Sequence, residues 1–97
     1  MKMVLIAYNE AIDEEVMELL EDAAVGGYTQ WTGVLGQGAT SGPHLLSHVW
    51  PKANNVLFAV VEDATAEALM AAAGRLKQTA AREGIQAFVL NVEARLE

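Results

Sequence analysis

The chain has 97 residues, 53% of them hydrophobic, and a formal net charge of −7 at pH 7. This length gives room for one domain, residues 1–97, and the apolar content is too high for a disordered chain. Six scattered basic residues against 13 acidic ones argue against nucleic acid as a partner, and the absence of cysteine excludes disulfides and thiolate metal sites.

The first half of the chain predicts a strand, a helix and a second strand. Residues 2–8 are apolar throughout, which is typical of a strand buried on both faces. Residues 12–25 have a helical pattern that the pair Gly26-Gly27 is expected to end. Residues 28–35 contain Thr, Trp and Val, a composition that favours a strand. The apolar stripe of the helix comprises Ile12, Val16, Leu19, Leu20 and Ala23.

The second half begins with a long interval, residues 36–55, that has no clear periodicity. Residues 56–62 then form a strand that is apolar on both alternations. Asp63 or Thr65 can cap a second helix that extends to about Arg82. Gly84 is expected to end this helix, and residues 85–92 form the last strand. The buried stripe of the second helix is predicted to be Leu69, Ala72, Ala73, Leu76 and Ala80.

The element order β-α-β-β-α-β predicts an α+β, ferredoxin-like fold. Both helices then cover one face of a four-stranded antiparallel sheet, with the first and third strands in the centre. Because residues 4–7 and 56–61 are apolar on both alternations, the other face also needs a cover. A second copy of the chain is the simplest one. No apolar run approaches the roughly 18 residues of a membrane helix, so direct membrane insertion is not expected.

The long interval holds both histidines of the chain. His44 and His48 are spaced i, i+4, so on a helical turn they could share one divalent Zn, Ni or Cu ion. Two ligands leave the coordination shell incomplete, and the alternative is a pair of exposed loop histidines. Trp50 is expected to anchor the loop to the domain.

The glycines at the start of the interval carry a second candidate site. Gly36, Gln37 and Gly38 could bring backbone N–H groups close to an anion, or they could simply mark where a strand becomes a loop. Their spacing does not match a dinucleotide-binding motif, and no Ser-His-Asp order, zinc-protease motif or P-loop occurs. We therefore do not expect an enzyme, although a loop histidine could act as a general base.

The strand ending in Gly33-Val34-Leu35-Gly36, the long loop and the apolar strand 56–61 together resemble the PII signalling superfamily over nearly the whole chain. The resemblance implies a homotrimer with inward-facing sheets, a T-loop at residues 38–54 and ligand sites between subunits. Gly42-Pro43-His44 and Trp50-Pro51 resemble the short PII-like branch encoded beside heavy-metal efflux pumps. The partner implied for this loop is a membrane transporter.

The segment before the last strand departs from the PII pattern. PII proteins hold nucleotide phosphates there with glycines and a lysine, whereas this chain has only Arg82-Glu83-Gly84, with Gln86 where a lysine is expected. Gln37 directly follows Gly36, so the usual glutamine is displaced. These departures predict weak or absent ATP and ADP binding. Any nucleotide that did bind would lie near Gly36, Gln37 and Gly84.

The leading hypothesis is a cytoplasmic PII-like regulator that responds to a small ligand or metal and controls a transporter through its loop. One alternative is a trimeric metal-binding protein similar to the divalent-cation-tolerance (CutA) proteins, with His44 and His48 as ligands. The other is a small ferredoxin-like enzyme with a histidine base.

Overall fold

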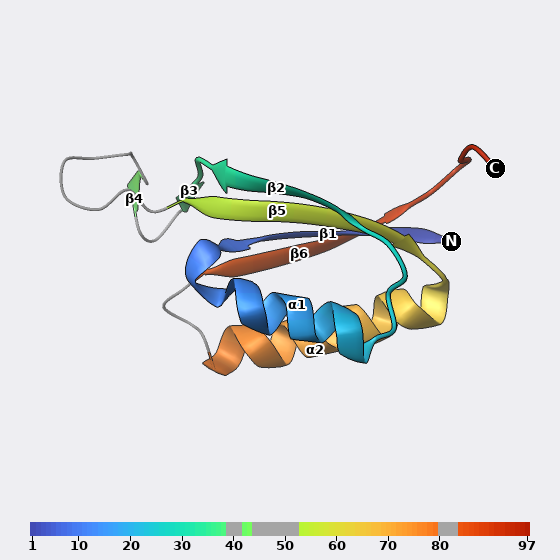
Figure 1. Ribbon diagram of the computed structural model, residues 1–97, viewed down its shortest axis with the longest axis horizontal. Coiled ribbons are helices and arrows are strands. Elements are labelled where there is room, and N and C mark those ends of the chain that lie inside the picture. Colours follow the sequence, from blue (N-terminus) through green and yellow to red (C-terminus); the bar gives the residue numbers. More distant parts are fainter. Residues whose placement is uncertain (39–41, 44–52, 80–83) are drawn as a thin grey trace.

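The computed structural model describes residues 1–38, 42–43, 53–79 and 84–97, with the backbone alone at 37–38 and 42–43. The helices pack on one face of a four-stranded sheet (Figure 1). The strand order is β2-β5-β1-β6 and all three neighbouring pairs are antiparallel. The predicted ferredoxin-like fold is confirmed, with its first and third long strands in the centre. The strands are β1 (Lys2–Asn9), β2 (Thr29–Val34), β5 (Asn54–Val61) and β6 (Ile85–Asn91).

The first helix differs from its predicted limits at both ends. A 3-10 turn, η1 (Glu10–Ile12), precedes α1 (Asp13–Asp22), because the Asn9 side chain accepts a hydrogen bond from the Ala11 N–H and caps the turn. At the other end Ala24 adopts a left-handed φ of 56°. The Val25 N–H donates to the Leu20 carbonyl at 3.0 Å. The helix therefore ends before Gly26-Gly27, in a Schellman-type turn centred on an alanine.

The second helix, α2 (Asp63–Thr79), begins at Asp63, one of its two predicted caps. Its predicted end near Arg82 and the stripe residue Ala80 lie outside the described residues. Leu69 and Ala73 are buried as expected, and Ala72 and Leu76 pack partly buried against the core. Ala66, one turn before Leu69, is also buried and was not part of the predicted stripe. No helix within the described ranges is long and apolar enough to cross a membrane.

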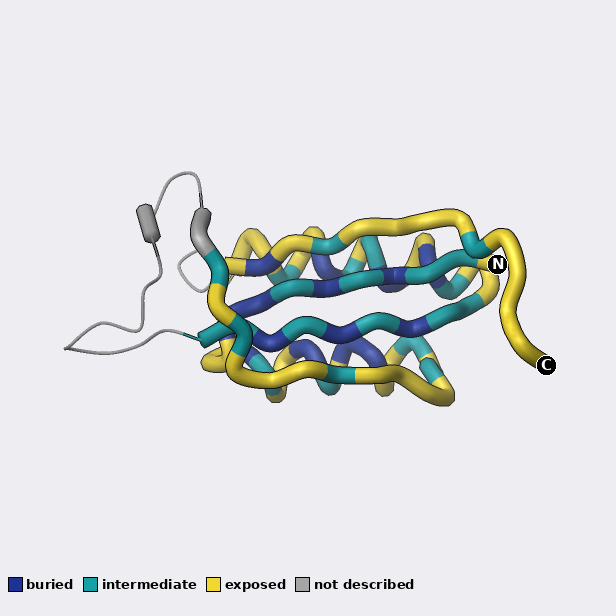
Figure 2. The backbone as a smooth tube through the Cα atoms, turned by 90° about the horizontal axis from the view of Figure 1, so that it is seen from above, coloured by how far each residue is buried: buried dark blue, intermediate teal, exposed yellow. Residues whose placement is uncertain are grey.

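The core lies between the helices and the sheet. Val4, Ile6 and Tyr8 of β1 and Leu57 of β5 are at most 1% exposed and face the helices. The predicted stripe of α1 packs against them, with only Ala23 partly exposed. Figure 2 shows buried and partly buried residues alternating along the two central strands, while the edge strands are largely exposed. The chain thus buries the helix-covered face of its two central strands, while Val89 of the edge strand β6 stays 41% exposed on that face.

The opposite face of the sheet, which we call the outer face, is apolar and only partly covered. In register, Leu5 lies between Phe58 and Phe88, and Met3 lies between Val60 and Leu90. Phe88 is 52% exposed and Leu90 47%. Trp31, also on this face, is half exposed beside Phe58, with ring centroids 5.7 Å apart. The predicted second apolar face is confirmed, and its cover by another copy of the chain stays a prediction.

The long interval contains more structure than its sequence pattern indicated. Two short strands, β3 (Gln37–Gly38) and β4 (Gly42–Pro43), pair antiparallel with Gln37 opposite Pro43. Before them, β2 changes its register on β5 between Trp31 and Val34. Within this irregularity Gly33 has a φ of 68°, which glycine adopts at little cost.

Candidate functional site

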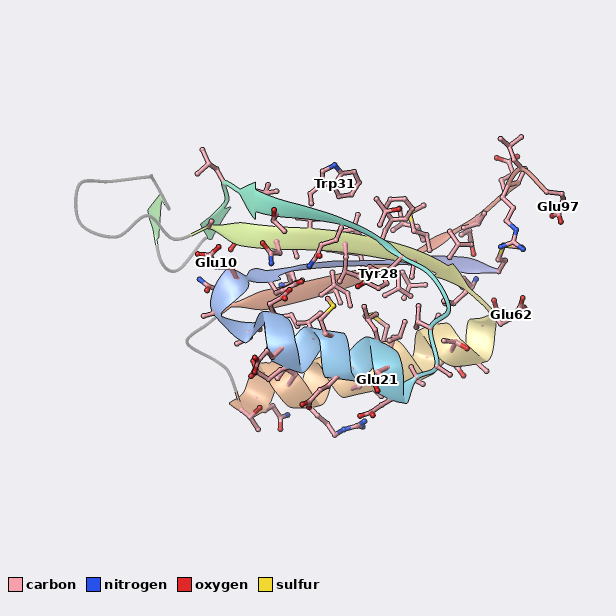
Figure 3. The ribbon with its side chains drawn as sticks, in the orientation of Figure 1. Glu10, Glu21, Tyr28, Trp31, Glu62 and Glu97 are labelled. Atoms are coloured by element: carbon pink, nitrogen blue, oxygen red, sulfur yellow. The ribbon has the colours of Figure 1, made fainter. Side chains whose placement is uncertain are left out.

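Three chain segments meet at the end of the sheet where the long loop begins. The Asn9 N–H donates to the Gly84 carbonyl, and the Glu10 N–H donates to the Ala53 carbonyl, both at 3.1 Å. The end of β1 therefore lies between the end of the long loop and the glycine before β6. Figure 3 labels Glu10 at this end of the molecule. Residues 33–36 and 53–55, which we call the loop root, lie at the same end.

Two of the predicted ligand glycines belong to this end. Gly36 packs so tightly on Asn54 that a Cβ there would overlap the Asn54 side-chain amide. Asn54 is opposite Asn9 in the sheet, and Asn9 in turn contacts Gly84. Gly84 has a φ of 76°, a left-handed conformation that favours glycine. The fold thus brings Gly36 and Gly84 to one end through two asparagines.

For the other predicted site residues, the structure describes no side chains, so their predicted roles stay predictions. Gln37 and Gly38 form the backbone of β3. His44, His48, Trp50 and Pro51 lie outside the described residues. Among the residues that are described, no group of three or more His, Cys, Asp or Glu side chains could hold a metal ion. The metal prediction for the two histidines therefore stays a prediction.

A lysine that the sequence analysis did not consider reaches this end from α2. The Lys77 ammonium donates to the Ile85 carbonyl at 2.7 Å, which connects the last turn of α2 to the start of β6. The sequence analysis looked for a lysine in the short segment before the last strand and found none. Lys77 lies one segment earlier, on the helix, and its exposed position in the last turn is typical of a helix-end cation.

A largely buried polar cluster stands directly behind the loop root. One carboxylate oxygen of Asp13 accepts hydrogen bonds from the Tyr8 hydroxyl at 2.6 Å, the Gln30 amide at 3.0 Å and the Asn55 amide at 3.2 Å. The Gln30 amide also donates to the Tyr8 hydroxyl at 2.8 Å. Burial, and next the hydrogen bond to Asp13, raises the pKa of Tyr8 to about 12. The polar cluster joins α1 to β1, β2 and β5.

The predicted site residues include no member of this cluster. In the sequence, Asn55 was noted only as the last residue of the long interval. The sequence did contain a signal for it. One apolar strand ends in Tyr8-Asn9 and another begins with Asn54-Asn55, so polar groups lie at the same end of two adjacent strands. Asn9 and Asn55 are only 7% and 5% exposed, and buried amides need partners.

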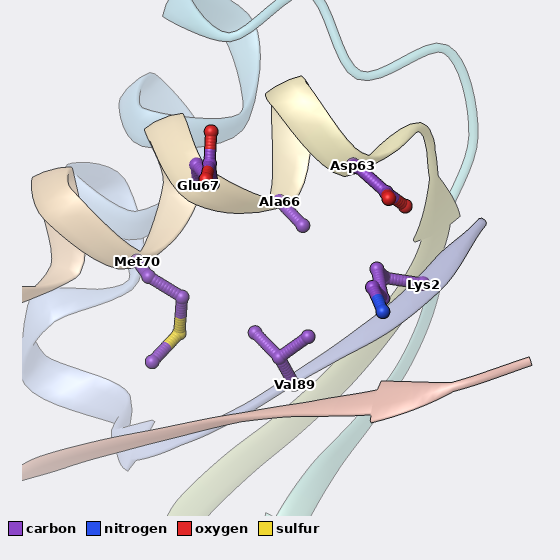
Figure 4. Close-up of a pocket in the computed structure, with 6 residues that line it drawn as sticks. All are labelled: Lys2, Asp63, Ala66, Glu67, Met70 and Val89. Carbon is purple, nitrogen blue, oxygen red and sulfur yellow. The ribbon is translucent and has the colours of Figure 1, made fainter.

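A groove of about 410 Å³ lies at the opposite end of the molecule, between α2 and strands β1 and β6 (Figure 4). Two of its charged side chains, Lys2 and Asp63, have partners within the chain. The Lys2 ammonium donates to the Asn91 side chain, and the N-terminal ammonium donates to Asp63 at 3.0 Å, which lowers the pKa of that carboxyl group. The groove is remote from the loop root. It is lined by Lys2, Asp63, Ala66, Glu67, Met70 and Val89.

Comparison with known protein families decides the classification. The family described as Nitrogen regulatory protein P-II matches residues 1–95. The chain belongs to this family. It is therefore a PII-like regulatory signalling protein, as the sequence resemblance predicted. No curated protein matches the sequence.

Solved structures of PII-like proteins share the fold. CPII from Thiomonas intermedia K12, bound to ADP, AMP and bicarbonate, superposes with a TM-score of 0.77 at 20% identity, over 99% of this chain and 93% of that one. The same protein bound to ADP and bicarbonate gives 0.74 at 22% identity, over 92% and 82%. A PII-like signalling protein from Thermus thermophilus gives 0.65 at 23% identity, over 94% and 85%.

Proposed function

We propose that this P-II protein senses a small anionic ligand at the loop root and signals its state through the long loop, residues 36–55. The observation that carries the proposal is that Gly36, Gly84 and the Lys77 ammonium all lie at the same end of the sheet, Gly36 after edge strand β2 and the other two at edge strand β6. Glycines allow backbone N–H groups to approach an anion closely, and a lysine supplies positive charge.

The ligand class we propose is an adenine nucleotide, ADP or AMP, with bicarbonate as a second ligand. Solved CPII structures contain ADP and bicarbonate, one of them with AMP. The prediction of weak or absent nucleotide binding rested on three departures: the short segment before the last strand, its missing lysine and the displaced Gln37. Lys77 weakens the second reason, because it brings a cation to the Ile85 carbonyl from the adjacent helix. In this proposal Lys77 contributes positive charge near the phosphates.

The assembly we propose is a homotrimer with the outer faces of the sheets turned inward. Trp31, Phe88 and Leu90 are about half exposed on one face, and gathered apolar side chains of this kind mark surfaces that proteins use for association. The family resemblance supplies the trimeric arrangement, with ligand sites between subunits. The subunits would therefore each contribute one loop root to a shared cleft.

The partner we propose is a membrane transporter that the long loop contacts in the cytoplasm, with Trp50-Pro51 in the contact. Metal binding by His44 and His48, in a branch encoded beside efflux pumps, is the second candidate, and the i, i+4 spacing favours it. Imidazole ligation needs the neutral form, so metal affinity should fall as the pH drops through about 6.5. The CutA-like and enzyme alternatives have no support among the described residues.

Calorimetry separates the two candidates. In the first experiment, ADP and AMP are titrated, with and without bicarbonate, into wild type, Lys77→Ala and Lys2→Ala. In the second, nickel and zinc are titrated into wild type and His44→Ala/His48→Ala. We expect Lys77→Ala to weaken ADP binding about tenfold, because it removes a charged group, while Lys2→Ala, at the remote groove, changes little. No heat with either nucleotide in wild type would contradict the nucleotide proposal. Equal metal affinity in the double-histidine variant would contradict the metal proposal.

A further inference from the structure

Asn55 connects the polar cluster to the loop root. Its side-chain N–H donates to Asp13 at 3.2 Å, and its side-chain oxygen accepts from the Gly33 N–H at 3.4 Å. Asn55 is 5% exposed, so water does not readily replace either bond. The two ends of one buried amide therefore face an acceptor on α1 and a donor on β2.

Gly33 is the residue at which β2 leaves its regular pairing. The register on β5 shifts between Trp31 and Val34, and Gly33 lies inside that shift with a φ of 68°. Asn55 thus provides the Gly33 N–H with an acceptor at the point where the ladder is irregular. This bond therefore lies where the chain turns from β2 towards the long loop.

The chemistry of Asp13 fixes which end of the Asn55 amide faces Gly33. An ionised carboxylate only accepts hydrogen bonds, so it selects the N–H end of Asn55 and leaves the oxygen for Gly33. Without that acceptor the amide could turn over, and its N–H group would then face the Gly33 N–H, donor against donor. The Tyr8 and Gln30 donors hold the same carboxylate oxygen in place, at 2.6 and 3.0 Å.

We propose that Asp13 is a positioning residue for the ligand site: through Asn55 it sets the conformation of Gly33 and hence of the loop root. This proposal rests on the proposed function, which places the ligand at the loop root. Asp13 itself need not touch the ligand.

The test compares three variants. Asp13→Ala removes the acceptor. Glu14→Ala is the matched control, because it removes an exposed carboxylate from the same first turn of α1. Asp13→Ala/Asn55→Asp is the rescue, since both oxygens of the introduced carboxylate accept and either one can receive the Gly33 N–H. Should Asp13→Ala fail to fold, Asp13→Asn takes its place, because its amide can also turn a donor towards Asn55.

Two measurements are made on each variant: amide hydrogen exchange at Gly33, with the Leu57 amide as an internal reference, and ADP affinity by calorimetry. We expect Asp13→Ala to speed Gly33 exchange about tenfold relative to Leu57 and to weaken ADP binding about five- to tenfold, the size of one lost hydrogen bond. Glu14→Ala should change neither by more than about twofold, and the rescue should recover most of both.

Three results would overturn the proposal: Gly33 exchange in Asp13→Ala equal to that in Glu14→Ala, faster Gly33 exchange with unchanged ADP affinity, or a loss that the rescue does not recover. A wild-type protein that binds no ADP would refute the nucleotide part of the proposed function instead. The Gly33 exchange of the three variants would then decide the role of Asp13 by itself.

Discussion

Val4 and Ile6 point towards the helices and are almost completely buried, whereas Met3 and Leu5, their neighbours on the same strand, point to the outer face and stay partly exposed. The side chains on the two faces are equally apolar, so the difference lies in the cover alone. The chain supplies two helices for one face and nothing from its described residues for the other. The first face therefore stabilises the single chain, and the second is the face that the proposed trimer would bury.

The largest effect is expected from a charge placed on the outer face, which tests whether this face is covered by another subunit. Phe88→Glu puts a carboxylate beside Leu5, where a neighbouring subunit would have to bury it. Light scattering of wild type should give about three times the chain mass of 10.4 kDa, and the variant should shift towards one chain mass. Ala71→Glu, at an exposed position of α2, is the control and should leave the mass unchanged. A wild-type protein of one chain mass would refute the trimer.

Truncating one leucine to alanine on each face compares how much the two faces contribute to the stability of the single chain. Leu57→Ala, at a completely buried position, should lower the free energy of unfolding by about 2–5 kcal/mol, because it leaves a cavity in the core. Leu90→Ala removes the same atoms from a half-exposed position and should cost less than about 1 kcal/mol. Both are measured by urea denaturation in the Phe88→Glu background, so that assembly does not contribute. Equal losses would mean that the outer face also stabilises the single chain.

The pH dependence of stability provides a third test on the helix-covered face. The pKa of Tyr8 is raised to about 12, so the folded state favours the neutral phenol. This stabilisation is fully present below pH 10 and is lost as the pH rises towards 12, by about 3 kcal/mol in total. Between these values the free energy of unfolding of wild type should fall relative to Tyr8→Phe. Tyr28→Phe, which removes an exposed phenol, should keep the wild-type slope.

The sequence predicts the fold well because its information is local and periodic. Continuous apolar runs and strand-favouring composition located the long strands, and the stripe that includes Val16 and Leu20 located the buried side of α1. The candidate site is harder, since its contacts join distant segments. Asp13 and Asn55 are 42 residues apart, and neither forms part of a motif. Lys77 reaches the Ile85 carbonyl across a segment in which the sequence analysis found no lysine.

The end of α1 was also predicted imprecisely from the sequence. Two glycines after a helical pattern are the usual stop signal, yet the left-handed residue that ends α1 is Ala24, two residues before Gly26. The position of the left-handed residue is set by how the chain must turn from α1 towards β2, and not by where glycine is available. This turn leaves an alanine with a φ of 56°, which costs an L-residue roughly 1 kcal/mol.

The smallest predicted effect concerns this left-handed turn at the end of α1. It changes the stability of the helix layer and leaves the assembly unchanged. Ala24→Gly should raise the free energy of unfolding by about 0.5–1 kcal/mol, because glycine adopts a left-handed φ without a steric penalty. Ala23→Gly, one residue earlier at a φ of −85°, is the matched control and should give no gain. Thermal unfolding of both variants, with light scattering, checks the prediction: the melting temperature of Ala24→Gly should rise while its mass stays that of wild type. A gain in both variants, or in neither, would show that the Ala24 backbone is not strained.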